Sequence, residues 1–197
     1  MKINKYKFLG AMLFFTLLMD VVPFFGFANV GSISITNLHI PGILTAIVLG
    51  PAYGGFIGGV FGVISLVRAV SRESTILDLL LQNPFVSVLP RILFPMAAGQ
   101  LYRFLSESLR GRLESLSISL SCAVGSALNS ILVLLALYLV DREELMGIFN
   151  VSDQAHIIPS LVHAFLPNML VEAAACIAVC LLVISGLREL SKASMEI

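Results

Sequence analysis

"ITNLHIPGILTAIVLGPAYGG", residues 35–55, sets a polar run directly before a short apolar one. The polar run holds Thr36, Asn37 and His39, and the apolar run covers residues 40–49. About ten residues of helix reach roughly 15 Å, whereas the hydrocarbon core of a bilayer is about 30 Å thick. The stretch therefore predicts a helix of about half the membrane's thickness.

Proline and glycine predict the ends of this short helix. Pro41 suits the first helical turn, where its missing N–H costs nothing. Gly50-Pro51 predicts a tight turn. To cross a membrane, the helix would have to start near Ser34, extend through Tyr53, or lie in a locally thinned bilayer.

The composition of the whole chain identifies its class. Of 197 residues, 58% are hydrophobic and only 12% are charged, with a mean hydropathy of +0.98. Soluble domains carry about 25% charged residues. We therefore expect an integral membrane protein. The net charge of zero argues against nucleic acid as a partner, and lipid is the expected surrounding.

Apolar runs predict an all-α bundle of six transmembrane helices in a single membrane domain, residues 1–197. The first run lacks a small-residue cleavage site, so we interpret it as a retained helix. The predicted segments are 8–28, 40–52, 54–71, 84–105, 114–140 and 161–187.

Lysine and arginine predict the orientation. With both termini inside, the inner side collects eight of these residues and the outer side three, which favours N-in and C-in. The inner set is Lys2, Lys5, Lys7, Arg103, Arg110, Arg112, Arg188 and Lys192, and the outer set is Arg68, Arg72 and Arg142.

Sequence motifs for catalysis, cofactors and metals are missing. No phosphate-binding G-x-x-x-x-G-K-[ST] loop occurs, so active transport would need an ion gradient or a separate motor. No nucleophile–base motif supports an enzyme, and no cofactor is expected. Cys176 and Cys180 share a helix face, but no histidine or carboxylate joins them in the sequence. We interpret them, with Cys122, as small hydrophobic residues and predict no metal site.

Polar residues inside the apolar segments are costly in lipid and therefore suggest a function. Arg91, Asn129, Asn168 and Glu172 all fall in the outer half of the predicted bundle, where they could line one cavity. The alternative is that Arg91 and Glu172 only pair with each other. We place His39 in an outer loop over the cavity mouth. The predicted substrate-binding set is Asn37, His39, Asn83, Arg91, Asn129, Asn168 and Glu172.

Glycines in the third segment form a stripe with four-residue spacing. Such a stripe lets another helix approach closely in lipid. Packing within the chain and docking of a partner protein both explain it. The glycines are Gly54, Gly55, Gly58, Gly59 and Gly62.

Several runs together resemble the substrate-binding (S) component of energy-coupling factor (ECF) vitamin transporters. They are "ITNLHIPGILTAIVLGPAYGGFIGGVFGVISL", "NPFVSVLPRILFPMAAGQLYR", "GSALNSILVLLALYL" and "NMLVE". The resemblance covers residues 8–187. It implies six membrane helices in a prokaryotic plasma membrane and a pocket near the outer face that the first outer loop helps to close. It also implies docking onto a transmembrane T component and two ATP-binding-cassette subunits, which would supply the motor.

Within the family, the chain is most similar to the pantothenate-type branch. Arg91 would then be the counter-ion of the pantothenate carboxylate, and Asn129, Asn168 and His39 would bind its amide and hydroxyls. Riboflavin, folate and hydroxymethylpyrimidine remain alternative vitamins. Two other classes stay open: a stand-alone ion-coupled transporter with Glu172 as its protonatable group, and a structural membrane protein without a solute.

S components generally carry a small-residue A-x-x-x-A-like face on the first helix, which docks the T component. Here the matching region reads "LGAMLFFTLL", with Gly10 and Ala11 but Phe14 and Phe15 four residues later. The docking face is thus half present, and the glycine stripe of the third segment is the second candidate.

Overall fold

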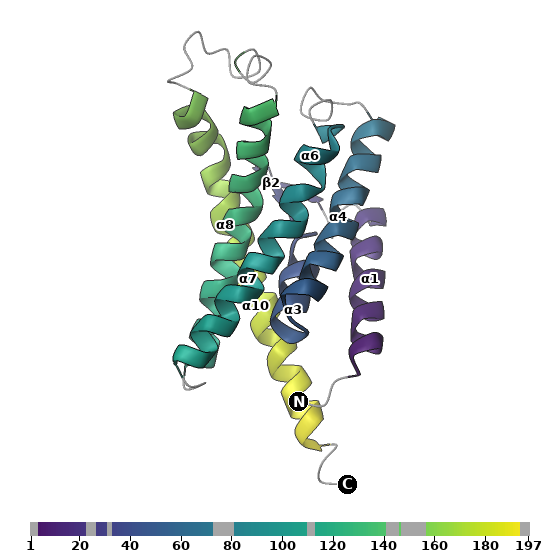
Figure 1. The fold of residues 1–197 in the computed structure, drawn as a ribbon, viewed down its shortest axis with the longest axis vertical. Helices are drawn as coiled ribbons and strands as arrows, with labels where there is room; N and C mark the ends of the chain where they lie inside the picture. The colour runs from purple at the N-terminus through teal and green to yellow at the C-terminus, as the bar shows by residue number, and fades with distance from the viewer. Residues whose placement is uncertain are drawn as a thin grey trace.

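The computed structural model describes residues 4–22, 27–30, 33–72, 81–109, 113–140, 146 and 157–193. Long helices run side by side along the bundle axis (Figure 1). The elements are α1 (Lys5–Val21), β1 (Phe27–Val30), β2 (Ile33–Thr36), α3 (Ile40–Val48), α4 (Pro51–Arg72), α6 (Pro84–Ser87), α7 (Leu89–Ser108), α8 (Glu114–Val140) and α10 (Ile157–Ala193).

Four of the described helical segments are long and apolar enough to cross a membrane: Pro51–Ser71, Pro84–Ser108, Glu114–Val140 and Leu166–Ser191. Helix α1, with 17 residues, lies at the lower limit of a membrane-spanning length, and α3, with 9, falls well short of it. The protein is thus a multi-pass membrane bundle. Six crossings stay a prediction.

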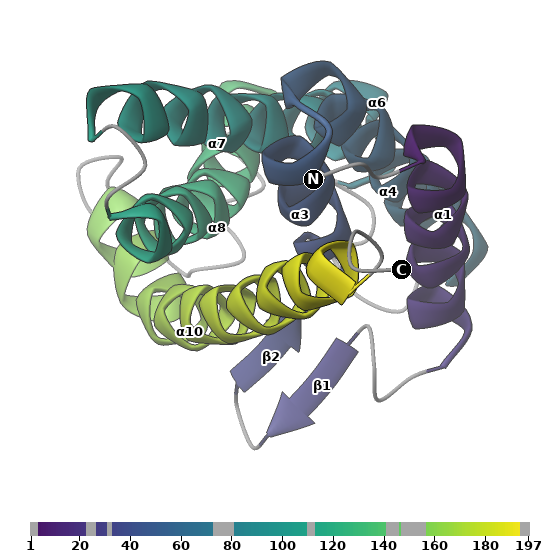
Figure 2. The same ribbon diagram turned by 90° about the horizontal axis from the view of Figure 1, so that it is seen from below.

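A β-hairpin corrects the all-α expectation. β1 and β2 pair antiparallel, with Phe27 opposite Thr36 and Val30 opposite Ile33. The hairpin lies beside α10 (Figure 2). Only Gly31 and Ser32 separate the strands in the sequence, and a two-residue Gly-Ser spacing is typical of hairpins.

The first helix is shorter than predicted for a local reason. It ends at Val21 instead of residue 28, and Val22 is extended, with φ −94° and ψ 106°. Val22 precedes Pro23, and a residue before proline is sterically disfavoured in the α conformation. Residues 27 and 28 of the predicted helix belong to β1.

Helix α3 begins as predicted, with Pro41 in its first turn, but it ends at Val48 instead of residue 52. Gly50 has a positive φ of 111°, and α4 already begins at Pro51. Neither predicted extension exists, because Ser34 belongs to β2 and Tyr53 to α4. Residues 40–47 are all buried, and α3 contacts α1, α4, α7, α8 and α10 (Figure 2). A half-length helix is stable here because protein surrounds it.

The later helices follow the sequence prediction more closely. Helix α8 has the predicted bounds 114–140. The predicted segment 84–105 is divided into α6 and α7 at Val88 and runs on to Ser108. Helix α10 covers the predicted segment 161–187 and is longer at both ends. Residues 73–80 and most of the 141–160 connection lie outside the described residues.

Polar contacts tie the helices together at both ends of the bundle. The start of α1 and the end of α10 lie at the same end (Figure 1). There the carboxylate of Glu114 accepts hydrogen bonds from Tyr102 (3.0 Å) and Arg188. Arg68 of α4 forms an ion pair of 3.1 Å with Asp20 near the other end of α1.

Candidate functional site

Arg91 lies buried in the first turn of α7, with 8% of its surface exposed. Its Nη1 donates a hydrogen bond of 2.7 Å to the carbonyl of Val86, and its guanidinium lies 5.7 Å from the centre of the Phe61 ring. Its Nε has no hydrogen-bond partner among the described residues. No described carboxylate pairs with it, so the Arg91–Glu172 ion pair offered as an alternative is not formed. A buried cation without a counter-ion costs several kcal/mol unless another group compensates the charge.

His39 lies in the turn before α3, at the N-cap of that helix, which is the connection in which the sequence predicted it. Its side chain is fully buried, and its position over a cavity mouth stays a prediction. Its Nε2 lies 3.0 Å from the hydroxyl oxygen of Ser126 on α8. Its ring meets Phe94 of α7 edge-on, with 6.4 Å between ring centres. His39 thus connects three helices in the interior.

Asn129 of α8 is buried as well, with 8% exposed. Its Oδ1 has no hydrogen-bond partner among the described residues, and neither does the hydroxyl of Ser121 on the same helix. Asn129 lies three residues after Ser126 and therefore shares a helix face with it. An unpaired buried acceptor costs about 1–3 kcal/mol unless a ligand or water donates to it.

Two predicted residues lie on α10, one turn apart. Glu172 is buried, with 4% exposed, and Asn168 is half-buried. Both take part in interactions within the chain. Helix α10 packs against α8, which carries Asn129. The structure thus places these polar residues on two helices that pack together, and substrate contact by Asn168 and Glu172 stays a prediction.

Asn83 and Asn37 occupy different surroundings. The Asn83 side chain accepts a hydrogen bond of 2.9 Å from the Phe85 N–H and so caps α6. Asn37 is half-buried and lines a cavity of about 380 Å³ between α1, α3 and α10. Neither Arg91 nor Asn129 lines this cavity. Its other lining residues are apolar: Met12, Phe15, Met19, Ile40, Pro41, Leu44, Ala175, Val179 and Val183.

Sequence reasoning missed three neighbours of the polar residues: Phe61, Phe94 and Ser126. Phe94 and Ser126 lie three residues from Arg91 and Asn129, so helical spacing was an available signal for both. Phe61 is on a different helix from Arg91, and its position over the guanidinium follows only from the packing of α4 on α7.

The two groups of predicted docking residues lie in opposite surroundings. Gly54, Gly55, Gly58 and Gly62 are buried against α3 or α7, and Gly59 is half-buried against Ile92. Packing within the chain therefore accounts for the α4 stripe. On α1, Gly10 and Ala11 are exposed, and no atom would lie within 4 Å of a side chain added at Gly10.

Membrane-length helices around buried polar side chains define a multi-pass membrane protein. The family described as "ECF transporter, substrate-specific component" matches residues 8–184, and the chain belongs to this family. The resemblance seen in the sequence is thereby confirmed. Members of this family are transport subunits, not enzymes. The membership and the four membrane-length helices establish a multi-pass protein of the prokaryotic plasma membrane.

A curated relative is the pantothenate transporter PanT of Leuconostoc mesenteroides subsp. mesenteroides. It is 34% identical to this chain over 106 residues, which cover 50% of this chain and 52% of the relative. The match therefore spans about half the length of each protein.

Proposed function

We propose that this chain is the high-affinity substrate-binding subunit of an ECF-type importer and that its solute is pantothenate. The observation that carries the proposal is Arg91, which is buried without a described carboxylate partner. Burial of an uncompensated charge costs several kcal/mol, and a bound carboxylate would offset this cost. The similarity to a pantothenate transporter supports the choice of solute.

Pantothenate offers one carboxylate, one amide and hydroxyl groups. The free Nε of Arg91 donates to the carboxylate in a charge-assisted hydrogen bond. The unpaired Oδ1 of Asn129 accepts from a hydroxyl or the amide N–H. Asn37, His39, Asn83, Asn168 and Glu172 complete the proposed set around these two anchors.

Energy for transport would come from separate subunits: a transmembrane T component and two ATP-binding-cassette subunits. We place both termini on the cytoplasmic side, where the ATP-binding subunits would dock. The start of α1 and the end of α10 share one end of the bundle, as this orientation requires (Figure 1). We assign docking to the outward face of α1 at Gly10 and Ala11, which no described part of the chain covers.

The proposal is tested by calorimetric titration of the purified chain with pantothenate and with its alcohol analogue, in which CH₂OH replaces the carboxylate. Wild type should bind the acid more tightly. Arg91→Met should weaken acid binding by about 2–5 kcal/mol, at least roughly thirtyfold in Kd, because the buried charge pair is lost. The same variant should bind the alcohol with little change.

The matched control is Arg103→Met, which removes an exposed arginine from the other end of the same helix. It should leave both affinities unchanged. If Arg91→Met does not fold, Arg91→Lys serves, because it keeps the charge and loses the planar donor geometry. Equal preference for acid over alcohol in wild type and variant would refute the role of Arg91. Binding of another vitamin with no response to pantothenate would refute the solute.

A further inference from the structure

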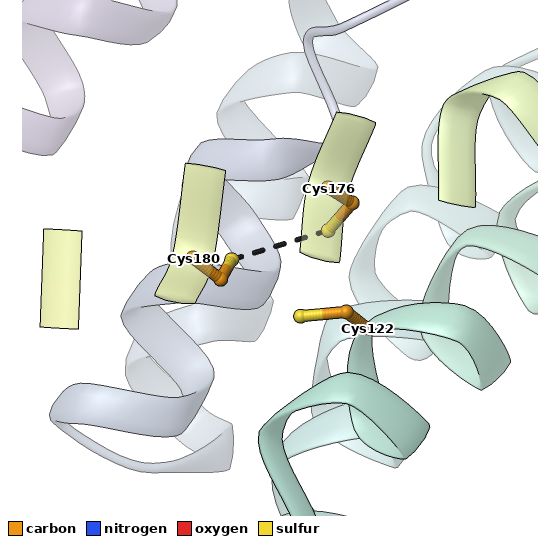
Figure 3. A group of neighbouring side chains, drawn as sticks. All are labelled: Cys122, Cys176 and Cys180. Carbon is orange, nitrogen blue, oxygen red and sulfur yellow. Dashed lines mark hydrogen bonds between the residues drawn. The ribbon is translucent and has the colours of Figure 1, made fainter. Parts of the chain in front are cut away.

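Three cysteines from distant parts of the chain meet in the interior of the bundle. Cys122 comes from α8, and Cys176 and Cys180 come from α10. All three are 0% exposed. Their sulfur atoms lie within 4.8 Å of one another, and those of Cys176 and Cys180 are 4.0 Å apart. The three side chains converge on a common point (Figure 3).

This spacing fits coordination of one metal ion. A thiolate binds zinc at about 2.3 Å, so sulfurs around one ion lie roughly 3.8 Å apart in a tetrahedral site and about 4.0 Å apart in a trigonal one. The Cys176–Cys180 separation already has this value. Cys122 can complete the set with a side-chain shift of less than about 1 Å, judged against the same geometry.

We propose that Cys122, Cys176 and Cys180 bind a thiophilic metal ion, Zn²⁺ or Cu⁺. Binding displaces thiol protons to water. Each cysteine binds as a thiolate, so three protons are released. Three thiolates leave a net charge of −1 with Zn²⁺ and −2 with Cu⁺, so a low-dielectric interior favours Zn²⁺. The sequence alone predicted no metal site, because only the packing of α8 on α10 adds Cys122 to the pair.

Such a centre would fasten α10 to α8. Cys176 lies one helical turn from Glu172, and Cys122 lies one turn from Ser126. The metal would therefore hold the polar residues of these two helices in register next to the proposed solute site. The inference does not depend on which solute the protein binds.

The first experiment measures metal in the full-length chain. Protein is expressed in zinc-supplemented medium and, separately, in copper-supplemented medium, then purified in detergent under reducing conditions without chelator. Elemental mass spectrometry should find one zinc or copper ion per chain in one of these preparations. The element detected identifies the bound ion. Metal-free protein titrated with Cd²⁺, a spectroscopic probe for zinc sites, should show thiolate-to-metal absorption that saturates at one equivalent. Less than a tenth of an equivalent in every arm would overturn the proposal.

Variants then locate the ion. Cys122→Ser should lower Cd²⁺ affinity at least roughly a hundredfold, because loss of a ligand exceeds the effect of losing an outer hydrogen bond. The matched control is Ala136→Ser, which adds a hydroxyl at a buried site of the same helix and should not change metal binding. Unchanged affinity in folded Cys122→Ser would refute the site.

A measurement on wild type covers the case in which Cys122→Ser does not fold. The cysteines are alkylated with iodoacetamide in mild denaturant, with and without added Zn²⁺ or Cu⁺. Bound metal should slow alkylation of all three cysteines together. Equal rates with and without both ions would also overturn the proposal.

Discussion

Helices α4 and α1 both carry glycines, yet the two sets have opposite surroundings. A side chain at Gly58 of α4 would overlap the carbonyl oxygen of Arg91, and one at Gly62 would come within 2.8 Å of the Val88 backbone. A side chain at Gly10 of α1 would meet nothing within 4 Å. The glycines of α4 thus let α7 approach closely, whereas Gly10 leaves a surface open.

This difference shows that the spacing of glycines predicts close helix packing but does not identify the helix that packs there. A four-residue stripe predicts that some helix comes near. On α4 that helix is α7 of the same chain, and the approach places Arg91 next to Phe61. On α1 no described helix lies near Gly10, which leaves this face open for the docking proposed above.

The largest effect is expected from Gly58→Leu, which tests whether the glycines of α4 are needed for packing against α7. The new side chain would collide with backbone, which cannot rotate away, so we expect a loss of more than about 3 kcal/mol in the free energy of unfolding. Thermal unfolding of the purified variant in detergent measures the effect. A variant of wild-type stability that binds solute but fails in uptake would show instead that Gly58 docks a partner.

Gly59→Ala compares a less tightly packed glycine of α4 with Gly58 of the same helix. Its Cβ would lie 3.4 Å from the Ile92 side chain, an ordinary contact. Replacing glycine by alanine in a helix gains about 0.5–1 kcal/mol. We therefore expect a slightly higher Tm in the same unfolding assay. A loss as large as that of Gly58→Leu would mean that the whole stripe is tightly packed.

Gly10→Leu should have the smallest effect on the isolated chain. We expect its unfolding free energy to stay within about 0.5 kcal/mol of wild type, because the site is exposed and open. Uptake by cells that express the T component and the ATP-binding subunits should nevertheless fall, since a larger side chain blocks close approach. Wild-type uptake by this variant would place the docking face elsewhere.

The candidate site was predictable in part. Arg91, Asn129 and Glu172 stand out as polar residues in apolar segments, and the structure buries all three. The sequence placed His39 in the connection before α3, but it could not predict the burial of the side chain, because the hydrogen bond to Ser126 comes from a residue 87 positions away.

The sequence by itself determined the membrane class, the bounds of α8 and the turn at Gly50, because hydropathy and backbone sterics act locally. Tertiary structure alone decided that α3 is a nine-residue helix enclosed by protein, that the α4 glycines face inward, and that three cysteines meet. Each of these results depends on contacts between helices that are far apart in the chain. The local pattern of residues does not predict such contacts.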